Sequence, residues 1–139
     1  MTIIKKLLAI LSVVLFANPA SADEPVEFIE SFQQSLDAPY RLFNTANVNA
    51  LIVLETSTGK LYQIHPGIGE NSVQGYYPIN EKDLTPEGSE SESNRFTLYP
   101  TLNIYSFVLV DQLVGRFWRV QWNYEYEKRF IQQLTRIFD

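Results

Sequence analysis

Few side chains in this sequence could do chemistry. There is no cysteine and one histidine, His65, which directly precedes Pro66. A serine-based catalytic triad would have to use this histidine, and no G-x-S-x-G nucleophile turn is present. A zinc site needs several histidine or cysteine ligands, so the sequence predicts neither a metal site nor a cofactor. We expect His65 to lie at a strand end, facing solvent or a backbone partner.

Two carboxylates occupy matching places in the chain. Glu55 and Asp111 each end an apolar run, and a glycine follows four residues later, at Gly59 and Gly115. Paired carboxylates can hydrolyse glycosides, so a carboxylate-dependent hydrolase stays open as an alternative. The interpretation that we favour is that each acid accepts backbone N–H groups of its own hairpin loop. The sequence therefore predicts that the protein is not an enzyme.

The candidate binding residues form two groups. The first lies in segment 66–94, which is rich in glycine, proline and acids and is expected to form one long solvated loop. Tyrosines exposed on such a loop are typical interface anchors, and acids speed the approach of a basic partner. The second group is aromatic and lies near the C-terminus. The predicted partner-binding residues are Tyr76, Tyr77, Glu81, Asp83, Glu87, Glu90, Glu92, Trp122, Tyr124 and Tyr126.

An internal repeat supplies the elements that must position these residues. Residues 40–64 align without a gap to residues 96–120, at an offset of 56. Each copy predicts an alternating strand, a continuous apolar run, and a second alternating strand that follows a glycine turn. The apolar runs, 51–54 and 107–110, are typical of strands that are covered on both faces.

Helices are expected on either side of the repeats. Pro25 suits the first turn of a helix, and apolar residues follow at helical spacing up to Leu36. At the other end, Phe130, Ile131 and Leu134 begin a second helical stripe. The predicted fold is therefore α+β: two duplicated three-stranded antiparallel units packed as a small sheet or sandwich, with one N-terminal and one C-terminal helix.

The N-terminus predicts export. Lys5 and Lys6 precede an apolar run, and residues 20–22 read Ala-Ser-Ala, which together form the pattern of a cleaved signal peptide. We therefore expect a signal peptide at 1–22 and a periplasmic or secreted domain at 23–139. The run is shorter than a bilayer span, so no stable membrane insertion is expected after cleavage. Losing both lysines would move the net charge from −5 to about −7, which argues against nucleic-acid binding.

The second copy carries a pattern of its own. Residues 98–103 read LYPT-x-N, and residues 111–122 read D-x-x-x-G-R-x-W-x-V-Q-W. This pattern resembles that of small uncharacterised secreted bacterial β proteins, a resemblance that implies no activity. The hairpin at 111–118 also looks like a blade hairpin of quinone-enzyme propellers. Two copies, however, are fewer than the four blades that a propeller needs.

These observations predict an exported, non-enzymatic binding module. The expected partner is another protein, of basic character, in an inhibitor- or immunity-like role. Three alternatives remain beside it: a small-molecule or glycan-binding module that uses exposed aromatics, the carboxylate-dependent hydrolase, and a subunit of an envelope assembly.

Overall fold

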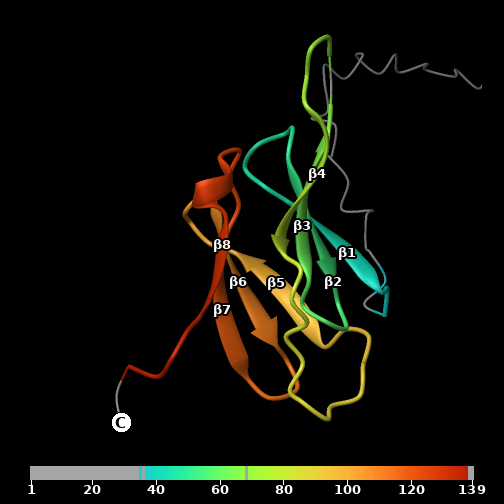
Figure 1. The fold of residues 1–139 in the computed structure, drawn as a ribbon, viewed down its shortest axis with the longest axis vertical. Coiled ribbons are helices and arrows are strands. Elements are labelled where there is room, and N and C mark those ends of the chain that lie inside the picture. The colour runs from blue at the N-terminus through green and yellow to red at the C-terminus, as the bar shows by residue number, and fades with distance from the viewer. Residues whose placement is uncertain (1–34, 36, 68, 138–139) are drawn as a thin grey trace, which may run out of the picture. The chain divides into compact units, whose positions relative to one another are not determined.

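The computed structural model describes residues 35, 37–67 and 69–137. The expected signal peptide and almost all of the expected N-terminal helix lie outside these residues. The described chain forms two four-stranded antiparallel sheets, each a meander in sequence order (Figure 1). Sheet 1 contains β1 (Tyr40–Asn44), β2 (Leu51–Glu55), β3 (Leu61–Pro66) and β4 (Gln74–Asn80). Sheet 2 contains β5 (Phe96–Pro100), β6 (Ser106–Asp111), β7 (Arg116–Gln121) and β8 (Phe130–Gln133), with a single 3-10 turn, η1 (Tyr126–Lys128), before β8.

The predicted α+β class is wrong, because the described residues contain no α-helix. The segment expected to be the C-terminal helix begins with β8, which pairs with β7 from Gln121–Phe130 to Trp118–Gln133. Pairing satisfies the backbone of β7, which would otherwise be a free edge. The apolar pair that suggested a helical stripe is divided between the two faces of the strand. Ile131 packs against the core, whereas the guanidinium of Arg119 lies 5.3 Å from the centre of the Phe130 ring.

The predicted three-stranded units are also wrong, since each has a fourth strand. Segment 66–94 was expected to be one loop, but it contains β4, which carries both Tyr76 and Tyr77. The rest of the segment is held to the sheets as well. The Leu84 side chain packs against the core, and its N–H donates to the Thr58 carbonyl at 2.8 Å. A flexible linker could therefore not replace this connection without loss of packing.

The two sheets repeat each other at the offset of 56 residues. The pair Tyr40–Glu55, which joins β1 to β2, is repeated by Phe96–Asp111, which joins β5 to β6. The pair Leu51–Ile64, which joins β2 to β3, is repeated by Phe107–Val120, which joins β6 to β7. The turns after β1 and β5 share their hydrogen bonds too. The Asn47 N–H donates to Thr45 Oγ1 at 3.0 Å, and the Asn103 N–H donates to Thr101 Oγ1 at 3.2 Å. The same residue types thus build the same local structure twice.

Glycines close the second hairpin of each sheet, as the sequence predicts. Gly59 has φ +77° and Gly115 has φ +69°, a region that glycine enters without a steric penalty. Their surroundings differ. A Cβ on Gly59 would come within 2.9 Å of Leu84 and 3.2 Å of Phe96, whereas nothing lies within 4 Å of a Cβ on Gly115. Segment 81–95 therefore covers Gly59, whereas the space beside Gly115 is open.

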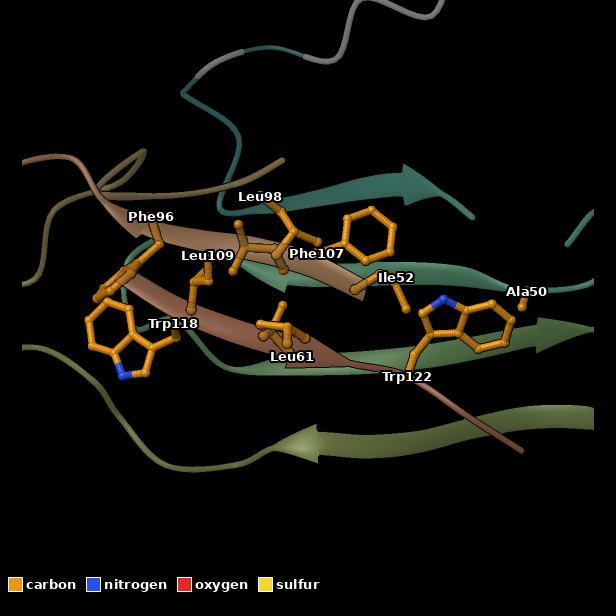
Figure 2. Packing of buried hydrophobic residues seen from close by; sticks show 11 residues of the cluster. Ala50, Ile52, Leu61, Phe96, Leu98, Phe107, Leu109, Trp118 and Trp122 are labelled. Atoms are coloured by element: carbon orange, nitrogen blue, oxygen red, sulfur yellow. The ribbon is translucent and has the colours of Figure 1, made fainter. Parts of the chain in front are cut away.

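One hydrophobic core joins the sheets, and the two copies do not present the same face to it. Sheet 1 contributes Ile52, Leu54 and Leu61, while sheet 2 contributes residues such as Leu109 and Trp118 (Figure 2). At the offset of 56, the sheet 1 residues correspond to positions 108, 110 and 117, which lie on the opposite face of sheet 2. Because side chains alternate along a strand, the sheets pack front to back rather than about a two-fold axis.

Candidate functional site

His65 lies on the core face of β3 and is buried. Its Nδ1–H donates to the Asn49 carbonyl at 3.1 Å, so its Nε2 accepts the amide N–H of Gln63 at 3.0 Å. Gln63 Oε1 in turn accepts the Asn123 N–H at 3.2 Å. The backbone partner expected for His65 is confirmed. Both ring nitrogens are used to join β3 to the turn before β2 and, through Gln63, to the segment after β7.

Asp111 is fully buried between two arginines. Arg95 donates to its carboxylate from Nε and Nη2 at 3.1 and 3.0 Å, and Arg116 donates from Nη2 at 2.8 Å. Burial by itself would raise the pKa of this carboxyl. The hydrogen bonds from Arg116, Arg95 and the Leu113 N–H outweigh that effect and hold the pKa below its ordinary value. The expected backbone hydrogen bond is confirmed, and it accompanies a buried ionic cluster that the sequence did not predict.

The structure does not pair Glu55 with Asp111. The two acids have equivalent places in the repeats, but the front-to-back packing turns Asp111 into the core and Glu55 to the outer face of sheet 1. They cannot act together on one glycosidic bond, so the geometry that favoured a hydrolase is not formed. Among the described residues there is also no group of three or more His, Cys, Asp or Glu that could hold a metal ion.

The acids of the segment between β4 and β5 are exposed: Glu81, Asp83, Glu87, Glu90 and Glu92. Asp83 also has a local role, since its carboxylate accepts the Thr85 N–H at 2.9 Å, which lowers the pKa of Asp83. The segment packs beside the hairpin turns at the start of β3 and β7, through Leu84 and the Arg116 guanidinium. Most of these acids therefore lie at the opposite end of β7 from η1.

The predicted C-terminal aromatics separate into buried and exposed residues. Trp122 is only 1% exposed, and its indole N–H donates to the Ile104 carbonyl at 3.1 Å. It therefore belongs to the core and cannot anchor a partner. Tyr124 is about half exposed, packs on His65 and accepts the Asn47 amide at 3.1 Å. Trp118 is buried as well, so the exposed aromatic platform of the glycan-binding alternative lacks both tryptophans.

Three of the predicted residues meet around Arg129, which directly precedes β8. The guanidinium carbon lies 4.8 Å from the centre of the Tyr77 ring and 5.2 Å from that of Tyr126. Beside it is a hollow of about 280 Å³, here called the Arg129 groove, which Glu81 also lines. The full lining is Pro78, Ile79, Glu81, Tyr126, Glu127 and Arg129.

The Arg129 groove combines apolar rings with charge. Tyr126 is 71% exposed and Tyr77 is 37% exposed, so both rings can contact a ligand. The Arg129 Nε is buried and has no hydrogen-bond partner within the described part of the chain. The carboxylates of Glu81 and Glu127 add negative charge at the rim. This arrangement can hold an amphipathic chain, with stacking contacts for its apolar parts and acids for a cation.

Arg129 was missed in the sequence because it fell inside the expected C-terminal helix. The repeat gave no signal for it either, because the two copies share almost no residues beyond residue 64: residues 74–80 read QGYYPIN where residues 130–136 read FIQQLTR. Only the structure shows that the first residues of β4 and β8, Gln74 and Phe130, are 56 positions apart.

Comparisons with protein-family models, with curated proteins and with solved structures found no match to this chain. No helix among the described residues is long and apolar enough to cross a membrane.

Proposed function

We propose that this chain is an exported, non-enzymatic binding module that holds a segment of another protein in the Arg129 groove. The observation that carries the proposal is the Arg129 guanidinium against the rings of Tyr77 and Tyr126, beside two acids. Tyrosine and arginine are enriched among the residues that dominate binding energy at protein interfaces. An inhibitor- or immunity-like role is consistent with this surface.

The size and charge of the groove narrow the class of ligand. Its volume of about 280 Å³ is at or below the low end of the range for small-molecule sites, which favours the side chains of an extended segment. Glu81 and Glu127 favour a cation, and the chain carries net charge −5. The partner is therefore expected to be a protein that presents a basic residue next to an apolar one.

We expect Tyr126→Ala to weaken binding of the partner by about 2 kcal/mol, or roughly thirtyfold, as removal of a central tyrosine anchor does. Arg129→Lys keeps the charge but loses the planar group that stacks on the rings, so it should also speed dissociation. The partner is first captured from an envelope extract of the native host on immobilised wild-type protein, and its kinetics are then measured by surface plasmon resonance.

The matched control is Leu113→Ala, which removes an exposed apolar side chain at the other end of β7 and should leave the kinetics unchanged. Glu81→Gln with Glu127→Gln should slow association and reduce its dependence on salt, because rim charges act mainly on the encounter rate. Equal affinities for wild type, Tyr126→Ala and Arg129→Lys would show that the partner binds elsewhere.

Export is the second part of the proposal and has its own test. The lysines, the apolar run and Ala-Ser-Ala at the N-terminus predict cleavage between Ala22 and Asp23. We therefore expect protein recovered from the periplasm or medium of the host to begin at Asp23, as measured by intact-mass spectrometry. Recovery of the chain with Met1 in a membrane fraction would contradict this expectation.

A further inference from the structure

Five apolar side chains gather on the outer face of sheet 1, the face that also carries Glu55 and is directed away from the core. A hollow of about 420 Å³ lies on it, lined by Tyr40, Val53, Tyr62, Ile64 and Tyr76, with Glu81 at its rim. Tyr40 is 55% exposed and Tyr76 is 68% exposed. Contiguous apolar surface of this kind on a soluble domain marks an interaction site. We call these five apolar residues the sheet 1 outer face.

The repeat identifies what this face is built to contact. Adding 56 to Tyr40, Val53, Tyr62 and Ile64 gives four residues of the core face of sheet 2: Phe96, Leu109, Trp118 and Val120. All four are buried against sheet 1. The sheet 1 outer face thus corresponds, position for position, to the core face of sheet 2, which packs on sheet 1 within this chain.

The complementary surface is present on the other side of the molecule. The core residues of sheet 1, Ile52, Leu54 and Leu61, correspond to Val108, Val110 and Phe117. These three are on the sheet 2 outer face, where the two valines are half-buried and Phe117 is 46% exposed. Val108 and Val110 belong to a continuous apolar run, which is typical of a strand covered on both faces. Among the described residues, the hydrophobic core covers only one face of that strand.

We propose that copies of this chain stack front to back, with the sheet 2 outer face of one copy on the sheet 1 outer face of the next. This contact would repeat between chains the packing that joins the two sheets within a chain. Charge is complementary as well, since Glu81 borders the first face and Arg119 is exposed on the second. The duplication alone explains why these positions correspond, but a front-to-back contact also explains why they are apolar on faces that the described residues leave uncovered.

Front-to-back contacts are heterologous, so they propagate until the sheets close a ring. Rings of four-stranded antiparallel sheets contain roughly four to eight sheets, and each chain supplies two. The expected assembly is therefore a closed ring of roughly two to four chains. The objection that two copies are too few for a propeller applies to a single chain and not to such a ring. The inference goes beyond the proposed binding function and does not depend on it.

The experiment measures mass in solution by light scattering and native mass spectrometry, on protein purified as its host accumulates it. Wild type should have a fixed multiple of the chain mass. Tyr62→Glu, on the sheet 1 outer face, and Phe117→Glu, on the sheet 2 outer face, should each be monomeric. Tyr76→Glu is a second variant of the first face, on an exposed edge position that cannot disturb the core. The control Leu113→Glu, in an exposed turn, should keep the wild-type mass.

Mixing the two monomeric variants tests the direction of stacking. Tyr62→Glu retains an intact sheet 2 outer face and Phe117→Glu retains an intact sheet 1 outer face, so an equal mixture should form a one-to-one dimer and nothing larger. Circular dichroism melting of each variant shows that its fold is retained.

Three results would overturn the proposal. One is a wild type that stays monomeric at every concentration. That result would overturn the proposal even if the sheet 1 outer face then proved to bind a different protein or lipid vesicles. Another is a Phe117→Glu variant that still dimerises while Tyr62→Glu does not, since that pattern indicates a symmetric contact between two sheet 1 faces. The third is a mixture of folded variants that remains monomeric.

Discussion

Asp111→Asn should destabilise the protein by about 3–5 kcal/mol, because removal of one member of a buried ion pair leaves its partner uncompensated. Arg95 is only 3% exposed and donates two hydrogen bonds to this carboxylate. An asparagine has one oxygen acceptor and no charge, so it cannot replace the carboxylate as acceptor of the two hydrogen bonds from Arg95 and the one from Arg116. The loss is measured as the change in free energy of unfolding in urea at neutral pH.

The matched control is Glu55→Gln, the equivalent substitution in the first repeat, where the side chain faces outward. It should change the free energy of unfolding by no more than about 0.5 kcal/mol, as exposed substitutions usually do. Equal losses in the two variants would contradict a special role for the buried cluster.

The effect of Asp111→Asn should also depend on pH. The pKa of Asp111 is lowered in the folded protein, so the folded state binds this proton less readily than the unfolded state does. The carboxylate therefore contributes its stability in full above the unfolded pKa of about 3.9, and loses it as the pH falls through the folded pKa. The difference between wild type and Asp111→Asn should be constant near neutrality and should shrink in acid below about pH 4.

Trp118→Ala should cost about 3–5 kcal/mol, the usual effect of deleting a large buried aromatic side chain. Trp118 is 4% exposed and packs against Phe96, with 6.0 Å between ring centres. Each kcal/mol lowers the melting temperature by roughly 4–8 °C in domains of 60–100 residues and by roughly 2–4 °C in domains of 150–250 residues. For this domain, which lies between those sizes, a fall of about 10 °C or more is expected by differential scanning calorimetry.

Leu102→Ala is the control for this variant, since Leu102 is an apolar residue in a fully exposed turn. Its melting temperature should stay close to that of the wild type at the same protein concentration. If Trp118→Ala had the same melting temperature as the wild type, the core face of β7 would be assigned incorrectly.

Local sequence patterns were sufficient to predict much of the fold. The glycines at 59 and 115 and the threonine–asparagine turns act through their own backbone, so their structure could be predicted from the sequence. The fourth strands could not, because β8 contains only two apolar residues in a row, Phe130 and Ile131, which fit a helix as well as a strand. Residues 130–133 form a strand because they pair with the free edge of β7. This is a tertiary interaction, which the local sequence pattern does not reveal.

The candidate site was predictable to a similar extent. Tyr77, Tyr126 and Glu81 were named because tyrosines and acids in exposed segments suit an interface, and their exposure agrees with that reasoning. Trp122 was grouped with them by type alone, although its burial depends on the turn at Ile104, a contact between distant parts of the chain. Arg129 was missed for the same reason as β8.

The hydrogen-bond chain through His65 makes this residue a natural spectroscopic reporter. Because the chain has one histidine, its imidazole gives a single set of ring signals in a magnetic resonance spectrum. That ring contacts Tyr77 and Tyr124, at 5.6 and 4.9 Å between centres, and through Gln63 it reaches the segment that follows β7. Any event that shifts one sheet against the other, or that moves Tyr77 in the Arg129 groove, is therefore recorded at one resolved position without an introduced label.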